Sequence, residues 1–322
     1  MPNTKEIQRR IRSINSTKKI TKAMEMVAAT KMRRATEAVL RTRTYANLSW
    51  ETVLSLSRSL GEQGQNIHPL LTKKNEVNRT AIVLITSNRG LCGGFNINVM
   101  KKTHESIEMH EKKQGREVDI LTVGNKGKDM YKYYGYNVDA VFDKADVAYE
   151  VKDVSPVAKM VMDGFRNRKY DKVMVAYTDF ISTSRQVPRV KQLLPVDLES
   201  QDEYLGIMGK DTRVGSDKEF IEQKREKHLS GQAVEEYMFE PDPQTVLEEM
   251  VPRLIEVQLF QALLESNASE HSARMTSMHQ ATESANDMVN ELTLSYNKAR
   301  QAAITSEISE ISAGVNALSE DN

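Results

Sequence analysis

Cysteine, aromatic residues and long apolar runs are all scarce in this sequence. Its 322 residues include one cysteine, Cys92, which excludes an internal disulfide and a cysteine-based metal cluster. Aromatic residues make up 6% of the chain and the mean hydropathy is −0.54, values that fit long, solvated helices better than one compact globule. No apolar run approaches the roughly 18 residues of a membrane span, and the N-terminus lacks the apolar core of a secretion signal. We therefore expect no direct membrane span, in a chain long enough to form one or two domains.

Known catalytic and nucleotide-binding motifs are missing as well. The sequence has no GxxxxGK[ST], GxSxG or HExxH pattern. SNRGLCGGFN at 87–96 has three glycines after a predicted strand, but not the GxGxxG spacing that brings backbone close to a pyrophosphate. We interpret it as a glycine turn with Cys92 as a small buried residue. The six histidines are scattered, and we expect them at the surface. The sequence thus predicts no catalytic residue, no cofactor and no metal site.

Charge is balanced overall but unevenly distributed. The chain has 45 Lys or Arg and 45 Asp or Glu, so bulk charge indicates no particular partner. Residues 1–60 hold 13 basic and four acidic residues, a net charge of +9. Residues 197–240 hold six basic and 12 acidic residues, a net charge of −6. The basic residues fit either a solvated helix face or a surface that meets acidic partners or phosphate, and both interpretations stay open.

Two long helices are predicted at the ends of the chain. Residues 1–60 contain no glycine or proline after Pro2, and at about 1.5 Å per residue they form a rod of roughly 80 Å. Ile7, Ile11 and Ile14 begin its apolar seam, which we expect Ile20, Met24 and Val27 to continue. Residues 244–322 form the second helix, which Pro252 starts or kinks. The segment 61–78 between the first helix and the next pattern is predicted to be a linker.

The seam of the second helix changes direction near its end. One heptad-like stripe is replaced by another that starts one residue later, which turns the apolar face by about 100°. Arg300 and Gln301 lie at this changeover, which a helix needs only if its neighbours change along its length. The first stripe comprises Ala285, Val289, Leu292, Tyr296, Ala299 and Ala303, and the second comprises Ile304, Ile308, Ile311, Val315 and Leu318.

Strands and helices alternate in residues 79–196, which predicts an α/β domain with a largely parallel sheet. Short apolar, β-branched runs mark the strands, and Pro188 makes the last of them an edge strand. Residues 197–240 are predicted to be an acidic surface insertion. The fold class that follows is α plus α/β: a long antiparallel coiled coil of the two terminal helices with an inserted Rossmann-like α/β domain. The predicted strands are 80–86, 118–123, 138–142, 172–177 and 186–194.

Four stretches carry a family resemblance. KITKAMEMVAATKM at 19–32, SNRGLCGGFN at 87–96, EPDP at 240–243 and most of 269–318 are similar to the gamma subunit of F-type ATP synthases. The similarity spans the chain and is most specific at its ends. The segment 197–236 departs from it, being longer than in ordinary bacterial gamma subunits. Chloroplast gamma subunits carry an insertion with a regulatory cysteine pair near this place, but this segment has no cysteine, so thiol regulation is not carried over.

The resemblance implies a non-catalytic rotor shaft. It would couple proton flow through the membrane c ring to conformational change and ATP synthesis in the catalytic beta subunits. Its partners would be three alpha and three beta subunits, the epsilon subunit and the c ring, with one copy of the chain per complex and no nucleic acid. The complex would lie peripherally on the cytoplasmic face of the bacterial inner membrane, the mitochondrial matrix being the alternative.

The resemblance also implies contact residues, matched position by position. Arg300, Gln301, Thr305 and Glu307 would face loops of the beta subunits. Lys18, Lys22 and Met24 would lie near the acidic levers of the beta subunits. No catalytic, cofactor-binding or metal-binding residue is implied.

Three other interpretations of the residues remain. The first is an interaction or scaffold protein with a coiled-coil stalk and an α/β head. The second is a dinucleotide-binding enzyme, against which the missing phosphate motifs count. The third is a nucleic-acid binder, which rests only on the basic first helix. The insertion at 197–236 would be an added contact with epsilon or beta, a brake on reverse rotation, or a tolerated surface loop, and we favour the loop.

Overall fold

The computed structural model describes residues 4–59, 68–74, 76–115, 117–133, 135–148, 150–196, 240 and 242–320. The chain divides into two compact units. The helical unit combines Met1–Ala28 with Arg274–Asn322, and the α/β unit is Ala29–Ala273. The predicted acidic insertion lies outside the described residues except for Glu240.

Both terminal segments are single long helices, as predicted. Helix α1 is Thr4–Ser59 and helix α7 is Pro243–Glu320, so each contributes to both units. Helix α7 begins with a side-chain cap: the Asp242 carboxylate accepts the Thr245 N–H at 2.9 Å and the Thr245 hydroxyl at 2.7 Å. The backbone bond from Thr245 lowers the pKa of Asp242. Pro252 lies inside α7, so it does not start the helix.

The α/β unit is built on a five-stranded sheet in the order β3-β2-β1-β4-β5. All neighbours are parallel except β4 and β5, which confirms the predicted sheet. Pro188 lies on the edge strand β5, opposite Thr178 of β4. The strands are β1 Arg79–Ile85, β2 Glu117–Val123, β3 Val138–Phe142, β4 Lys172–Phe180 and β5 Gln186–Leu194. The helices between them are α3 Phe95–Gln114, α4 Asn125–Tyr133, the short 3-10 helix η2 Val151–Asp153, and α5 Ser155–Arg166.

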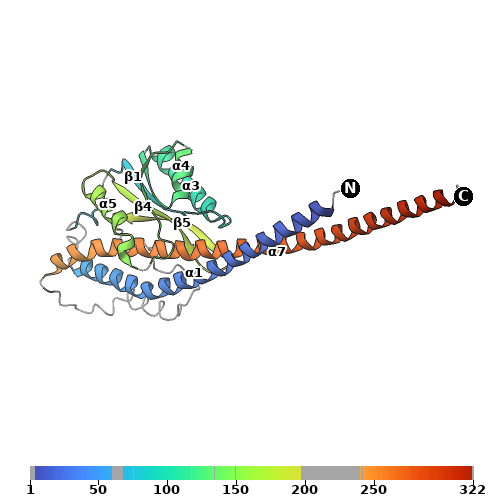
Figure 1. Cartoon of the computed structure of the whole chain (residues 1–322). Helices are drawn as coiled ribbons and strands as arrows, with labels where there is room; N and C mark the ends of the chain where they lie inside the picture. Colours follow the sequence, from blue (N-terminus) through green and yellow to red (C-terminus); the bar gives the residue numbers. More distant parts are fainter. Residues whose placement is uncertain are drawn as a thin grey trace. The chain divides into compact units, whose positions relative to one another are not determined.

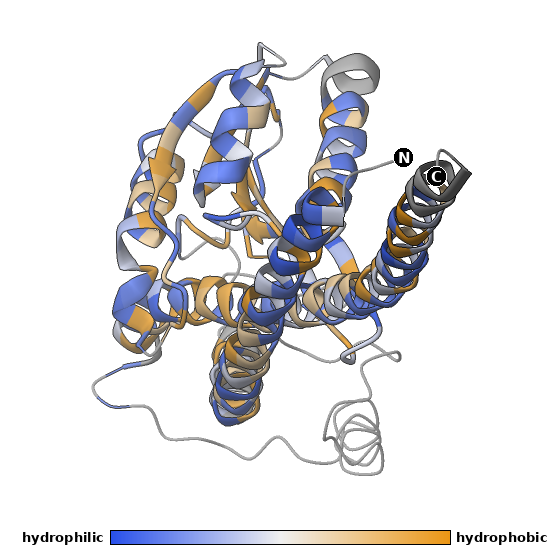
Figure 2. Cartoon of the chain, turned by 45° about the vertical axis from the view of Figure 1, so that its right-hand side comes forward, coloured by the Kyte–Doolittle hydropathy of each residue, from blue (hydrophilic) through white to orange (hydrophobic). Residues whose placement is uncertain are grey.

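Helices cover both faces of the sheet, which explains its continuously apolar central strands. On β1, Ile82 and Leu84 pack with residues of α3 and α4, while Val83 and Ile85 belong to the core on the opposite face. That second core holds α5 together with parts of α1 and α7. Figure 2 shows the hydrophobic strands enclosed by helices with hydrophilic outer surfaces.

Helix α7 is enclosed on all sides as it passes the sheet. Every residue from Val257 to Ser272 is buried. Leu259 and Leu263 lie in the core on the α5 face of the sheet, together with Val83 of β1. Trp50 of α1 belongs to the same core. Figure 1 shows α1 running alongside α7 in this unit. The α/β unit therefore surrounds the C-terminal helix instead of lying against one side of it.

In the helical unit α1 and α7 pair in antiparallel directions. Lys18 Nζ donates to Asn286 Oδ1 at 2.7 Å, the Thr282 hydroxyl donates to the Thr21 hydroxyl at 2.8 Å, and His279 Nδ1 lies 3.3 Å from Glu25 Oε1. Residue numbers thus fall along α7 as they rise along α1. This confirms the predicted antiparallel pair of terminal helices.

Several predictions about buried positions were wrong. Three histidines expected at the surface, His68, His110 and His271, are at most 3% exposed. Each has a polar neighbour: the Leu70 N–H donates to His68 Nδ1, His110 Nε2 lies 3.1 Å from the Met174 sulfur, and His271 Nε2 donates to the Asp146 carbonyl. A ring that is satisfied in this way can be buried at low cost.

The predicted linker 61–78 also contains a packed turn. Leu70 and Leu71 lie in the core on the α5 and α7 side of the sheet, and the Val196 N–H donates to the Leu70 carbonyl at 3.0 Å. His68 opens this turn. Burial, helped by the nearby positive charge of Arg166, lowers the pKa of His68 to about 4.

The pKa of His68 has its ordinary value of 6.5 in the unfolded chain and is about 4 in the folded chain. Acid therefore favours unfolding, because the unfolded chain binds the proton more readily. The stabilising contribution is complete above pH 6.5 and is lost as the pH falls towards 4. We expect the free energy of unfolding, measured with urea, to fall from pH 7 to pH 5 in the wild-type chain. This fall should be about 2 kcal/mol larger than the fall in His68→Asn. Equal losses in the two proteins would contradict this assignment.

Candidate functional site

All seven contact residues predicted from the resemblance lie in the helical unit. Lys18, Lys22 and Met24 lie on α1, in the part that pairs with α7. Arg300, Gln301, Thr305 and Glu307 lie on α7 near its C-terminal end. The two groups therefore occupy the paired part and the end of α7, and are considered in turn.

The two lysines on α1 are held by neighbouring side chains. Lys18 donates across the helix pair to Asn286. Lys22 Nζ lies 2.9 Å from Glu25 Oε1, and this hydrogen bond is the main cause that lowers the pKa of Glu25. Since the Glu25 side chain is only 16% exposed and also faces His279, it fixes Lys22 at the edge of the pair. Met24 is half-buried beside it.

The outer face of α1 carries apolar side chains that the predicted seam placed inside. Ile20 and Val27 are 59% and 56% exposed, and Met26 is 57% exposed. The buried positions are instead Thr21 and Ala28, whose small side chains allow the two helices to approach closely. Both sets fit heptad spacing, and the prediction failed because it chose the large apolar residues at that spacing and not the small ones. Three exposed apolar side chains on one short stretch mark a surface suited to a partner.

The paired part of α7 ends close to the four predicted polar residues. Lys18 faces Asn286, and α1 begins at Thr4, fourteen residues earlier. In an antiparallel pair, the position on α7 level with Thr4 is therefore fourteen residues after Asn286, which is Arg300. From Gln301 onwards α7 extends past the first described residue of α1. Val289, Leu292, Tyr296, Ala299 and Ala302 are half-buried, whereas Ala303, which we predicted to close the first stripe, is exposed.

The end of α7 is open to solvent. Arg300, Gln301, Thr305 and Glu307 are all exposed, and the Thr305 hydroxyl donates back to the Gln301 carbonyl at 2.9 Å. Apolar side chains of the second stripe are exposed there too: Ile304 by 48% and Ile308 by 62%. Ile304, Ile308 and Ile311 of the second stripe are therefore exposed in the part of α7 whose side chains the structure describes.

The glycine-rich loop after β1 is organised by its own side chains. The Ser87 N–H donates to Asn96 Oδ1 at 3.0 Å, and Asn96 Nδ2 donates to Ser87 Oγ at 2.7 Å and to the Cys92 sulfur at 3.3 Å. Cys92 is 2% exposed, as expected of a small buried residue. A buried thiol held between these groups is not accessible to a substrate.

The described residues contain no group of three His, Cys, Asp or Glu side chains placed to hold a metal ion. Over the same residues, none of the helices is both long and apolar enough to cross a membrane. The described residues do offer extended contact surfaces on α1 and at the end of α7.

Comparison with known proteins gives a consistent result. The family model described as ATP synthase matches residues 3–318. The ATP synthase gamma chain of Herpetosiphon aurantiacus is 40% identical over 326 aligned positions, covering 99% of this chain and 100% of the relative. The gamma chain of Heliobacterium modesticaldum is also 40% identical, and that of Legionella pneumophila is 36% identical, each with 99% of this chain and 100% of the relative covered.

Solved structures share the fold. A chain of the Euglena gracilis mitochondrial ATP synthase, in its OSCP/F1/c-ring structure, superposes with a TM-score of 0.62 at 21% identity, covering 98% of this chain and 94% of that chain. A chain of the Euglena rotor gives 0.58 at 19% identity, with 94% and 98% covered. The resemblance drawn from the sequence motifs is thereby confirmed: the chain belongs to the ATP synthase gamma chain family.

Proposed function

We propose that this chain is the central rotor shaft of an F-type ATP synthase, coupling proton flow through a membrane c ring to ATP synthesis in catalytic beta subunits. As a gamma chain it is a non-catalytic subunit of the complex. The match to the gamma family over nearly the whole chain is the observation that carries this function. The scaffold, dinucleotide-binding and nucleic-acid-binding interpretations are not favoured.

The mechanism follows from differential contact. A shaft changes the state of a surrounding subunit only if it binds that subunit's conformations with different free energies. Because α1 is basic and apolar on its outer face while the end of α7 is a single exposed helix, rotation would present different surfaces to each beta subunit. Exposed apolar side chains such as Ile20 and Ile308 give non-directional contacts, which do not strongly favour one rotational position of the shaft over the others.

Polar contacts at a few positions would then define preferred angles. We propose that Arg300, Gln301, Thr305 and Glu307 contact loops of the beta subunits, a role supported by their exposure at the end of α7. We propose a second contact at Lys22 and Met24, with Lys18 holding the helix pair through Asn286 while it faces the same partner.

The partners and location are also proposals. We infer one copy per complex, with three alpha and three beta subunits, an epsilon subunit and the c ring, on the cytoplasmic face of a bacterial inner membrane. Support comes from the bacterial origin of the similar gamma chains and from the rotor and c-ring assemblies that contain the similar structures. In this arrangement 79–196 would contact epsilon and the c ring, the paired helices 1–60 and 244–322 would form the shaft, and 197–240 would be a surface loop.

Purification of the complex from native membranes tests the assignment. We expect the chain to co-purify with alpha and beta subunits at one copy to three and three, and to be released with them when the peripheral sector is stripped from the membrane. The stoichiometry is measured by quantitative mass spectrometry of the purified assembly. A chain that is absent from this assembly would rule out the rotor function.

The contact at the end of α7 is tested by replacing Arg300→Ala together with Gln301→Ala. Loss of two polar contacts, each contributing about 1 kcal/mol, should reduce coupled ATP turnover about tenfold or more while the chain still assembles. The matched control is Asn290→Ala with Glu291→Ala, two exposed residues on the paired part of the same helix. Turnover is measured in membrane vesicles, and equal rates in both variants would exclude the contact.

A further inference from the structure

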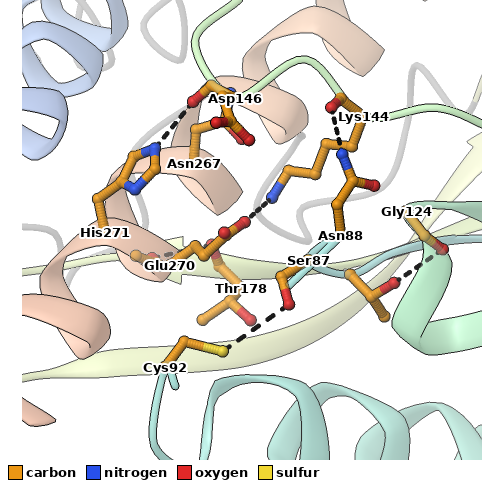
Figure 3. A network of polar contacts seen from close by, with 12 residues as sticks. Ser87, Asn88, Cys92, Gly124, Lys144, Asp146, Thr178, Asn267, Glu270 and His271 are labelled. Carbon is orange, nitrogen blue, oxygen red and sulfur yellow. Dashed lines mark hydrogen bonds and ion pairs between the residues drawn. The ribbon is translucent and has the colours of Figure 1, made fainter. Parts of the chain in front are cut away.

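The carboxyl ends of the parallel strands form the usual ligand site of an open α/β sheet. In such folds the ligand lies where the connections from a central strand diverge to either side. Here β1 has β2 on one side and β4 on the other, which places that point between β1 and β4. No ligand is needed to fill it, because α7 runs through this position. Figure 3 shows Glu270 of α7 beside Thr178 of β4 and pointing to Lys144, which lies next to Asn88 after β1, while His271 points to Asp146.

A buried ion pair lies at the centre of this arrangement. Lys144, in the loop after β3, places its Nζ 2.6 Å from Glu270 Oε2, and the two side chains are only 2% and 7% exposed. Asn88 Nδ2 donates to the Lys144 carbonyl at 2.7 Å, which holds the backbone of the loop. The ammonium group also lies 5.4 Å from the centre of the Phe95 ring. The pair thus joins α7 to the loops after β1 and β3.

Adjacent contacts connect the same loop to α7. Asn267 Nδ2 donates to the Ala145 carbonyl at 3.3 Å, and His271 Nε2 donates to the Asp146 carbonyl at 2.8 Å. At about 100° per residue, Asn267, Glu270 and His271 point to one side of the helix. This side of α7 is therefore held by three consecutive residues of a single loop.

The opposite side of α7 is held by β4 and the turn that follows it. The Ser269 hydroxyl donates to the Thr178 carbonyl at 3.2 Å, and the Ser272 hydroxyl donates to the Thr183 carbonyl at 2.9 Å. Two and five residues after Asn267, these serines point roughly opposite to it on the helix. Polar contacts thus grip the helix from two sides within six residues.

The first helix is fixed to the same loop. Lys31 of α1 places its Nζ 2.7 Å from Asp146 Oδ2, and this bond is the first cause that lowers the pKa of Asp146. Asp146 also accepts from His271 through its carbonyl. The loop from Lys144 to Asp146 is therefore tied to both long helices in the α/β unit.

Stability alone does not account for this polar set. A buried ion pair seldom stabilises a fold more than apolar side chains of the same size, because both ions lose their hydration. Apolar contacts, however, are non-directional, so they define the rotation and axial position of a helix less specifically than polar contacts do. Hydrogen bonds and ion pairs have a defined geometry and fix both the rotation and the axial position of the helix.

We propose that the polar clamp, defined as Asn267, Ser269, Glu270, His271 and Ser272 with their partners in 144–146, 178 and 183, is the joint that transmits torque between the α/β unit and α7. This inference rests on the proposed rotor function. Because α7 continues without a break to Glu320, a helix fixed at the clamp carries its rotation to its own end. Lys144 and Glu270 are positioning residues, which fix the rotation of α7 within the α/β unit. In the proposed function the α/β unit is driven by the c ring, and α7 acts on the beta subunits.

The test distinguishes a role of the Lys144–Glu270 ion pair in fixing the rotation of α7 from a role in stabilising the fold. In Lys144→Met with Glu270→Met the charges are replaced by apolar side chains of similar length, so we expect the isolated chain to unfold at the same or a higher denaturant concentration. In the complete enzyme we expect near-normal ATP hydrolysis. The number of protons pumped per ATP hydrolysed should fall about fivefold or more, because the charge-assisted bond is lost. Lys144→Glu with Glu270→Lys should recover part of the pumping.

The matched control removes an exposed ion pair, Lys102→Gln with Glu105→Gln on α3, and should leave the pumping ratio unchanged. A wild-type pumping ratio in the double methionine variant overturns the clamp. If that variant does not assemble, Ser269→Ala with Ser272→Ala decides, because it removes only the contacts on the opposite side; a wild-type ratio there also overturns the proposal. A wild-type chain that supports no coupled pumping would instead contradict the rotor function itself.

Discussion

The burial of α7 from Val257 to Ser272 determines how the α/β unit is built around this helix. A helix buried on every side cannot satisfy its polar side chains with water. The surrounding unit supplies partners for five of them, Asn267, Ser269, Glu270, His271 and Ser272. The first part of the stretch is apolar and lies in the core of the sheet. The second part is polar and lies at the carboxyl ends of the strands, where loops can supply charges and carbonyl groups. One helix thus serves as both a core element and the equivalent of a bound ligand.

This arrangement places a helix of the same chain at the usual ligand position of a nucleotide-type sheet. The glycine turn after β1 uses its amide and hydroxyl groups internally, through Ser87 and Asn96. Asn88, at the position from which such loops approach a phosphate, holds the Lys144 backbone instead. The sheet geometry is therefore retained, while the site chemistry is directed at the chain's own C-terminal helix.

Much of the fold could be predicted from the sequence, because the signals are local. The β-branched runs matched all five strands, and Pro188 identified the edge strand since proline cannot donate to a central ladder. Side-chain burial was harder. The helix pair buries Thr21 and Ala28 and exposes Ile20 and Val27, a choice made by the spacing to a partner helix more than 250 residues away, as the Thr21–Thr282 separation of 261 shows.

The polar clamp could not be predicted, because its members are ordinary residues until the fold brings them together. Lys144 and Glu270 are 126 residues apart in the sequence, and neither belongs to a motif that implies an ion pair. His271 is similar: alone it is typical of a surface position, and its hydrogen bond to the Asp146 carbonyl lowers the free-energy cost of its burial. The contact residues at Arg300 and Gln301 came from the family resemblance and the shifted seam, and their contacts stay a prediction.

Whether this chain rotates in the assembled complex can be observed with a bead attached to it. The only cysteine, Cys92, is buried, and Tyr133 of the α/β unit is 86% exposed, so Tyr133→Cys gives a single accessible site for a bead. With the alpha and beta subunits of the assembled complex fixed to a surface, we predict that ATP drives the bead in continuous rotation in one direction. A bead that stays at one angle while ATP is hydrolysed would contradict the account of this chain as a rotor.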